Sequence, residues 1–290
     1  MIASVVMLVS MLSLSNVVLA QTYSIENVKD NVFRFTAGNY HSVFITTEEG
    51  TIVTDPISED AAKHLRAYLR EQNLLPITYM FYSHNHVDHV TGGEILSQDS
   101  TQVIAHKLAA QNIAFTKAPT RLVDITFTRN LTVNSGTTSV DLTYHGPNNG
   151  LGSVSYLIQP ANVLYVVDWI VVGRMPYKDL IGYDITGMIN STKEVLATKD
   201  FDLFIGGHAS MGTRQDIEHY LDYLETLYSA VKEGMLAGKT LPELQNSIKL
   251  DKFSNLKMYD EWLTYNIEGV YKSLINDSYF NFRQDLDTEF

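Results

Sequence analysis

The sequence predicts an α/β sandwich built from mixed β-sheets. Short apolar strand runs fall in two blocks along the chain, helical runs lie between and after them, and turn signals separate neighbouring strands. Because strands and helices alternate in two blocks, mixed sheets are favoured over a purely parallel, doubly wound sheet.

The first block consists of short strands with helices between the later ones. Ser58 is expected to cap a helix that runs to about Glu71, and shorter helices are expected near Glu94 and over residues 107–111. The strands are expected at residues 32–37, 42–46, 51–54, 77–82 and 102–105.

The second block returns to strands and ends in helices. Asp184 is expected to cap a helix that reaches Lys199. Beyond Gly212 the chain is expected to be mostly helical, with interruptions near Gly238 and Ser254. The strands are expected at residues 125–127, 131–133, 140–144, 153–158, 163–167 and 203–205.

Composition limits the function classes. The chain has 290 residues, no Cys and a formal net charge of −12. Without Cys it has neither disulfides nor thiolate ligands, so a bound metal must use His, Asp, Glu or Asn. The acidic charge argues against a nucleic-acid partner and leaves a small-molecule substrate as the expected one. Oligomeric state stays open.

The first twenty residues resemble a secretory signal peptide. They carry no charged side chain, are mostly apolar from Ile2 to Val18, and end in Ala20, which suits a signal peptidase. Residues 21–290 are then expected to form one domain with a helical C-terminal part from about 213 to 290, located in the periplasm or secreted. The alternative is an uncleaved membrane anchor; after cleavage no membrane association is expected.

One motif carries most of the chemistry. His84-Asn85-His86-Val87-Asp88-His89 follows the apolar run 77–82, so it leaves the end of a core strand. Imidazole nitrogens and carboxylate oxygens are the ligands that zinc and similar divalent metals accept. In extended backbone His84 and His86 point to the same side and can hold one ion, while Asp88 and His89 can face a second.

Further ligands are expected at other strand ends. Asp168 ends the apolar run 163–167, where a buried carboxylate needs a charged partner or a metal. His208 follows another strand and a Gly-Gly turn. Asp55, also at a strand end, is expected to orient a motif histidine.

The HxHxDH motif, the later Asp and the Gly-His pair together resemble the metallo-β-lactamase superfamily. The resemblance implies a four-layer αββα sandwich of two mixed β-sheets (α+β class) with a metal pair at one edge. It implies that His84 and His86 bind the first metal, that Asp88, His89 and His208 bind the second, and that Asp168 bridges them.

The chain departs from that family at one position. The family expects a third histidine for the first metal in a Gly-Pro-x-His segment, and here that position falls on Asn149. An amide oxygen is a poorer zinc ligand than imidazole, so one or two zinc ions are expected, with iron or manganese as alternatives. His145 could replace the missing ligand if the loop is rearranged.

The resemblance implies metal-dependent hydrolysis. A metal-activated hydroxide would attack a small carbonyl-type substrate such as a lactam, a lactone or a thioester, and Asp88 would also act as a catalytic proton carrier. The alternatives are an iron-dependent sulfur oxidoreductase of the same superfamily and a non-catalytic binding protein with a decayed metal site.

Overall fold

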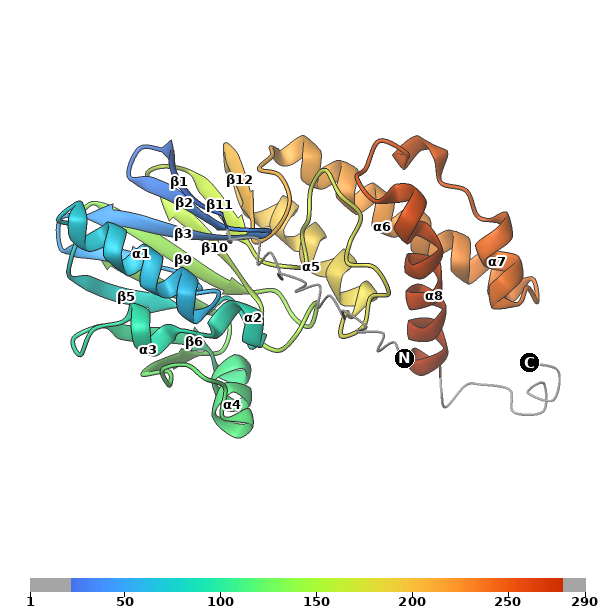
Figure 1. The fold of residues 1–290 in the computed structure, drawn as a ribbon. Helices are drawn as coiled ribbons and strands as arrows, with labels where there is room; N and C mark the ends of the chain where they lie inside the picture. Colours follow the sequence, from blue (N-terminus) through green and yellow to red (C-terminus); the bar gives the residue numbers. More distant parts are fainter. Residues whose placement is uncertain (1–21, 279–290) are drawn as a thin grey trace, which may run out of the picture.

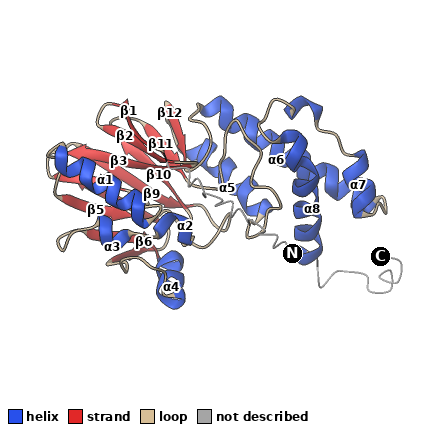
Figure 2. Cartoon of the chain, viewed as in Figure 1, coloured by secondary structure: helices blue, strands red, loops and turns tan. Residues whose placement is uncertain are grey.

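The computed structural model describes residues 22–278, and the predicted signal peptide lies outside them. Two β-sheets pack face to face, and helices cover both outer faces (Figures 1 and 2). Among the residues described, no helix is long and apolar enough to cross a membrane.

The first sheet has seven strands in sequence order. The pairs from β1 to β4 are antiparallel, and the pairs from β4 to β7 are parallel, so the sheet is mixed. Its strands are β1 (Tyr23–Lys29), β2 (Val32–Ala37), β3 (Tyr40–Thr47), β4 (Gly50–Val53), β5 (Ile77–Phe81), β6 (Gln102–His106) and β7 (Ile125–Phe127).

The second sheet has five strands in the order β12-β11-β10-β9-β8. Its pairs are antiparallel except for β11 with β12, which are parallel. Because β11 and β12 run in the same direction, the segments that follow them leave the sheet side by side. The strands are β8 (Asn130–Ser135), β9 (Thr138–Tyr144), β10 (Val154–Gln159), β11 (Val163–Val166) and β12 (Leu203–Gly206).

The helices begin where the sequence provides caps. The Ser58 side chain accepts a hydrogen bond from Ala61 N at the start of α1, and the Asp184 side chain accepts one from Gly187 N at the start of α5, which confirms both predicted caps. The helices are α1 (Glu59–Glu71), α2 (Val87–Val90), α3 (Gly93–Leu96), α4 (Lys107–Thr116), α5 (Ile185–Thr198), α6 (Arg214–Leu236), α7 (Leu241–Ser247), the 3₁₀ turn η1 (Asp251–Phe253) and α8 (Tyr259–Asp277).

Three buried apolar clusters hold the layers together. One lies between the two sheets and includes Phe81 and Tyr156. A second joins the first sheet to α1 and α4, and a third joins the second sheet to α5, α6 and α8. Burial of these faces is the main stabilising contribution. The predicted αββα sandwich of two mixed sheets is confirmed.

Strand β1 was not predicted from the sequence. Its residues YSIENVK are largely exposed or half-buried, because β1 is an edge strand that pairs with β2 alone. An edge strand buries little apolar surface, so the alternation that identifies a half-buried strand is weak.

Candidate metal centre

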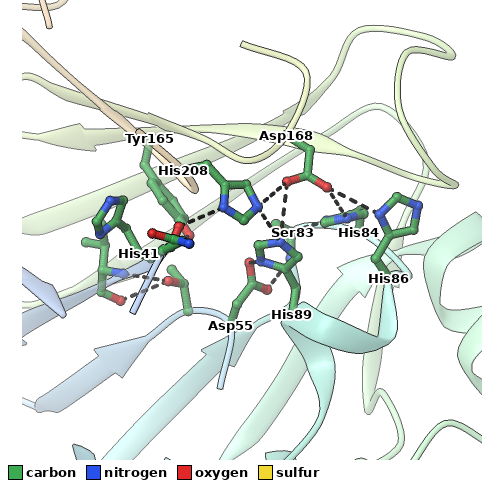
Figure 3. Close-up of polar contacts among 12 residues, drawn as sticks. His41, Asp55, Ser83, His84, His86, His89, Tyr165, Asp168 and His208 are labelled. Carbon is green, nitrogen blue, oxygen red and sulfur yellow. Dashed lines mark hydrogen bonds and ion pairs between the residues drawn. The ribbon is translucent and has the colours of Figure 1, made fainter. Parts of the chain in front are cut away.

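Three loops meet at the edge of the sandwich where strands of both sheets end. The first, residues 83–89, follows β5; the second carries Asp168 after β11; the third carries His208 after β12. Figure 3 shows the Asp168 carboxylate facing His84, His86, His89 and His208. The predicted convergence of distant segments is therefore present in the structure.

The two oxygens of Asp168 face different pairs of imidazoles. Oδ2 lies 3.1 Å from Nε2 of His84 and 3.2 Å from Nδ1 of His86. Oδ1 lies 3.3 Å from Nε2 of His89 and 3.0 Å from Nε2 of His208. We call His84, His86 and Asp168 the first cation group, and His89, Asp168 and His208 the second. Within each group the ligand atoms lie within 4.8 Å of one another.

Neighbouring groups orient the imidazoles. Nδ1 of His208 donates to the backbone oxygen of Asn39 at 2.8 Å, so in the neutral ring Nε2 keeps its lone pair toward Asp168. Ser83 Oγ lies 2.8 Å from Nδ1 of His84 and orients that ring in the same way. Such contacts are typical of metal-binding histidines, which use the second ring nitrogen as an anchor.

Asp55 faces the ring nitrogen of His89 that points away from Asp168, as predicted for a residue that orients a motif histidine. It is fully buried, its Oδ2 lies 3.7 Å from Nδ1 of His89, and its Oδ1 accepts a hydrogen bond from Ser83 N at 2.8 Å. Burial raises the pKa of Asp55 to about 6, against the opposing effect of His89.

Asp168 itself has a strained backbone. Its φ of 66° lies in the left-handed region, which costs a residue with a Cβ about 1 kcal/mol or more. The strand β11 ends at Val166, so this turn redirects the side chain toward both cation groups. Such strain is common where a side chain must be held at a functional site.

Burial and neighbouring charges act in opposite directions on the pKa values of the cluster. Burial opposes the ionisation of Asp168, yet the imidazoles of His89 and His84 hold its pKa well below the usual value. Burial likewise opposes protonation of His89, yet Asp168, with Asp55 and Asp88, raises its pKa to about 9. Burial lowers the pKa of His84 to about 4, so that imidazole is neutral at pH 7.

The donor set fits a divalent cation. Within residues 22–278, Nε2 of His84 and Oδ1 of Asp168 are buried and have no hydrogen-bond partner. Each nevertheless lies close to another potential metal ligand: Nε2 of His84 to Oδ2 of Asp168, and Oδ1 of Asp168 to Nε2 of His208. Buried polar atoms are rarely left unsatisfied. A cation between imidazole nitrogen and carboxylate oxygen would satisfy them, and these are the ligand types that zinc prefers.

Asp88 lies outside both cation groups. Helix α2 begins at Val87, so Asp88 falls in its first turn and is exposed, whereas an extended backbone would have kept it beside its neighbours. Burial, together with the nearby carboxylate of Asp88, raises the pKa of the Tyr40 phenol. The other five predicted ligands, His84, His86, His89, Asp168 and His208, are brought together.

Tyr40 is a site residue that sequence reasoning missed. Its ring lies edge-on to the second cation group, with ring centroids 4.8 Å from His208 and 5.5 Å from His89. The only sequence signal was its place beside the turn residue Asn39, at the start of β3. Its contacts come from tertiary packing, which no local pattern reports.

His145 is directed away from the cation groups. Its Nε2 lies 2.8 Å from Ser155 Oγ, and its Nδ1 lies 3.4 Å from Glu194 Oε1. Both ring nitrogens therefore have polar neighbours elsewhere, and the loop rearrangement considered for His145 is not seen in the structure.

Comparison with known proteins identifies related sequences and folds. Residues 35–208 match the family described as the Metallo-beta-lactamase superfamily. The chain is 25% identical over 238 residues, covering 81% of this chain and 69% of the relative, to the 2,4-dinitroanisole O-demethylase subunit alpha of Nocardioides sp. (strain JS1661).

Solved structures share the fold at low sequence identity. A metallo-beta-lactamase from Pontibacter korlensis superposes with a TM-score of 0.64 at 16% identity, covering 70% of this chain and 99% of that one. DIM-1 metallo-beta-lactamase superposes with a TM-score of 0.60 at 18% identity, covering 70% of this chain and 97% of that one. A double mutant of the sec-alkyl sulfatase PisA1 gives 0.72 at 15%, covering 87% of this chain but only 50% of the sulfatase.

Proposed function

Because the chain belongs to the metallo-beta-lactamase superfamily, we propose that it is a metal-dependent hydrolase of small carbonyl-type substrates such as a lactam, a lactone or a thioester. The observation that carries this proposal is the placement of Asp168, whose two oxygens each face a separate pair of imidazoles. One carboxylate between two imidazole pairs is suited to a pair of cations rather than to a single structural ion.

The two cation groups would hold zinc, with iron or manganese as the alternatives. A bound divalent cation lowers the pKa of water so that hydroxide is available near pH 7, and it polarises the substrate oxygen. The protein residues keep these ligands in place: Ser83 orients His84, Asn39 orients His208, and Asp55 supports His89.

Asp88 and Tyr40 are the proposed proton carriers. Asp88 is exposed, and its carboxylate is near enough to raise the pKa of both the Tyr40 phenol and the His89 imidazole. A carboxylate that is not itself a ligand is free to accept a proton from the attacking water and to pass it to the leaving group. The phenol would hold that carboxylate toward the substrate.

The surroundings of the first cation group favour a substrate with an apolar part. Val87, directly after His86, is 56% exposed, and Leu151 is 44% exposed. Leu151 N donates to Asn85 Oδ1 at 2.6 Å, which places Leu151 beside the motif loop. Exposed apolar side chains next to a polar centre are typical of ligand sites.

An aryl methyl ether is a second candidate substrate, because the Nocardioides relative is named as a 2,4-dinitroanisole O-demethylase subunit and covers 81% of this chain. Hydrolysis would add water to the aromatic carbon, break its bond to the methoxy oxygen, and release a phenol and methanol. Nitro groups on the ring would make that carbon electrophilic enough for attack.

The test is to purify the chain without its first 20 residues, load it with zinc, and measure metal content and turnover of lactams, lactones, thioesters and dinitroanisole. Turnover that His89→Ala abolishes while the fold is retained would support a hydrolase. Failure to bind zinc at saturation would refute the proposal. Iron in the purified protein with oxygen uptake on a persulfide would favour the sulfur oxidoreductase, and metal binding without turnover would favour a decayed site.

We also propose that the protein acts in the periplasm or outside the cell, because the first twenty residues resemble a signal peptide. The substrate would then be a small extracellular molecule, and the net charge of −12 disfavours nucleic acid. Fractionation of cells that express the full chain tests the location.

A further inference from the structure

The loop between β9 and β10 lies along the metal-binding motif. Val154 N donates to Ser83 O at 3.1 Å, which joins the end of this loop to the start of the motif loop. A Cβ added to Gly150 would lie 2.8 Å from Nε2 of His86 and 3.1 Å from Cδ2 of His84. Gly150, the residue after Asn149, therefore lies close to both imidazoles of the first cation group.

The Asn149 side chain has no hydrogen-bond partner in the described part of the chain. It is 1% exposed, and both Oδ1 and Nδ2 are buried and unsatisfied. Its backbone is held on both sides, because its N–H donates to Asn148 Oδ1 at 2.5 Å and its carbonyl accepts from Ser153 Oγ. The residue is fixed in place while its amide remains unpaired.

The neighbouring Asn148 differs in this respect. Asn148 is 2% exposed, yet its Oδ1 accepts from Asn149 N and its Nδ2 donates to Ser191 Oγ at 3.3 Å. Two buried amides in one loop thus have different environments. A buried amide with neither end paired is costly, and a bound ligand removes that cost.

We propose that Oδ1 of Asn149 is a protein ligand of the first cation group, together with His84, His86 and Asp168. This inference rests on the metal centre of the proposed function. An amide oxygen is a ligand for hard divalent cations, and a cation on Oδ1 leaves Nδ2 free to donate to an oxygen of the substrate. His145 does not compete for this role, because its ring faces Ser155 and Glu194.

The proposed ligand set has a consequence for metal choice. Two imidazoles, a carboxylate and an amide oxygen form a harder set than three imidazoles with a carboxylate. Manganese is therefore expected to compete with zinc better in this protein than in an Asn149→His variant. The second cation group, which does not include Asn149, is not expected to change.

The experiment is calorimetric titration of the metal-free protein with Zn²⁺ and, separately, with Mn²⁺. The wild type should show two binding events. Asn149→Ala should weaken one event by about 10-fold or more and leave the other unchanged. Asn149→Asp should strengthen the same event, because a carboxylate keeps the oxygen and adds charge, and this variant decides the matter if the alanine variant does not fold.

Asn148→Ala is the matched control from the same loop. It removes a paired amide, so it should lower the melting temperature and leave both binding events near wild-type affinity. Metal-free Asn149→Ala, in contrast, should melt no lower than the wild type, since it removes an unpaired amide. A purely structural asparagine would reverse that pattern.

Two failures are distinguishable. If the wild type binds two ions and Asn149→Ala binds both with unchanged affinity, the role of Asn149 is refuted and the metal centre stands. If the wild type binds no ion, the centre itself is refuted, and the inference falls with it.

Discussion

Replacing His145 by glutamine should change how stability depends on pH. His145 is 7% exposed, and burial, which is the largest cause, lowers its pKa from 6.5 to about 4. The nearby Lys199 and Arg129 lower the pKa further, while Glu194 opposes the shift. Between about pH 4 and pH 6.5 the ring is therefore neutral in the folded protein, whereas in the unfolded chain it binds a proton.

The sign follows from linkage. The folded pKa lies below the unfolded one, so the contribution of His145 to stability is constant above pH 6.5 and is lost as the pH falls toward 4. At about 1.4 kcal/mol per pH unit, the wild type should lose about 2.5 kcal/mol through this group between about pH 7.5 and about pH 4.5. The glutamine variant lacks this loss.

Urea denaturation of the metal-free proteins at the two pH values measures the effect. The glutamine variant should be less stable than the wild type near neutral pH, and that deficit should shrink by about 2.5 kcal/mol at acid pH. Ser155→Ala is the control, because it removes the hydroxyl 2.8 Å from Nε2 but keeps the imidazole and hence the pH dependence. A deficit of equal size at both pH values would show that His145 is not buried in neutral form.

The metal centre supports three further predictions. Because Asp168, Asp55 and Asp88 raise the pKa of His89 to about 9, zinc binding at pH 7 should release a proton from that ring. Calorimetry in buffers of different ionisation enthalpy measures the release. A binding heat that does not depend on the buffer would contradict the prediction. Asp168→Asn should weaken both metal-binding events, whereas His208→Ala should weaken only one. If a titration shows that Asp168→Asn also weakens only one event, a carboxylate shared by the two groups is excluded. Tyr40→Phe keeps the ring contacts and removes the hydroxyl near Asp88, so kcat should fall about 10-fold to 100-fold with unchanged zinc affinity. An unchanged kcat would remove Tyr40 from the proton path.

Local patterns predicted the elements that bury apolar faces. The caps at Ser58 and Asp184 and the strand before the motif were recognisable because turn chemistry and apolar runs are properties of adjacent residues. Strand β1 escaped because it lies at a sheet edge, where burial leaves a weak pattern.

The candidate site shows the same division. Asp168 was a candidate because it follows an apolar run, where a buried carboxylate is costly, and His208 because it follows a strand and a Gly-Gly turn. The exposure of Asp88 was not foreseen, because α2 begins one residue earlier and changes the direction of the side chain. The positions of Tyr40 against His89 and of the unpaired Asn149 amide depend on packing with residues that are distant in sequence.

The amino-acid sequence alone determined the layered fold and the candidate ligands. Hydrophobic periodicity and the residue types that bind metals can both be recognised in short stretches of adjacent residues. Tertiary structure decided that each oxygen of Asp168 faces its own pair of imidazoles, that Tyr40 lies against His89 and His208, and that His145 faces Ser155. Those relations depend on how two sheets pack, and packing joins residues more than 80 positions apart through contacts that no local pattern encodes.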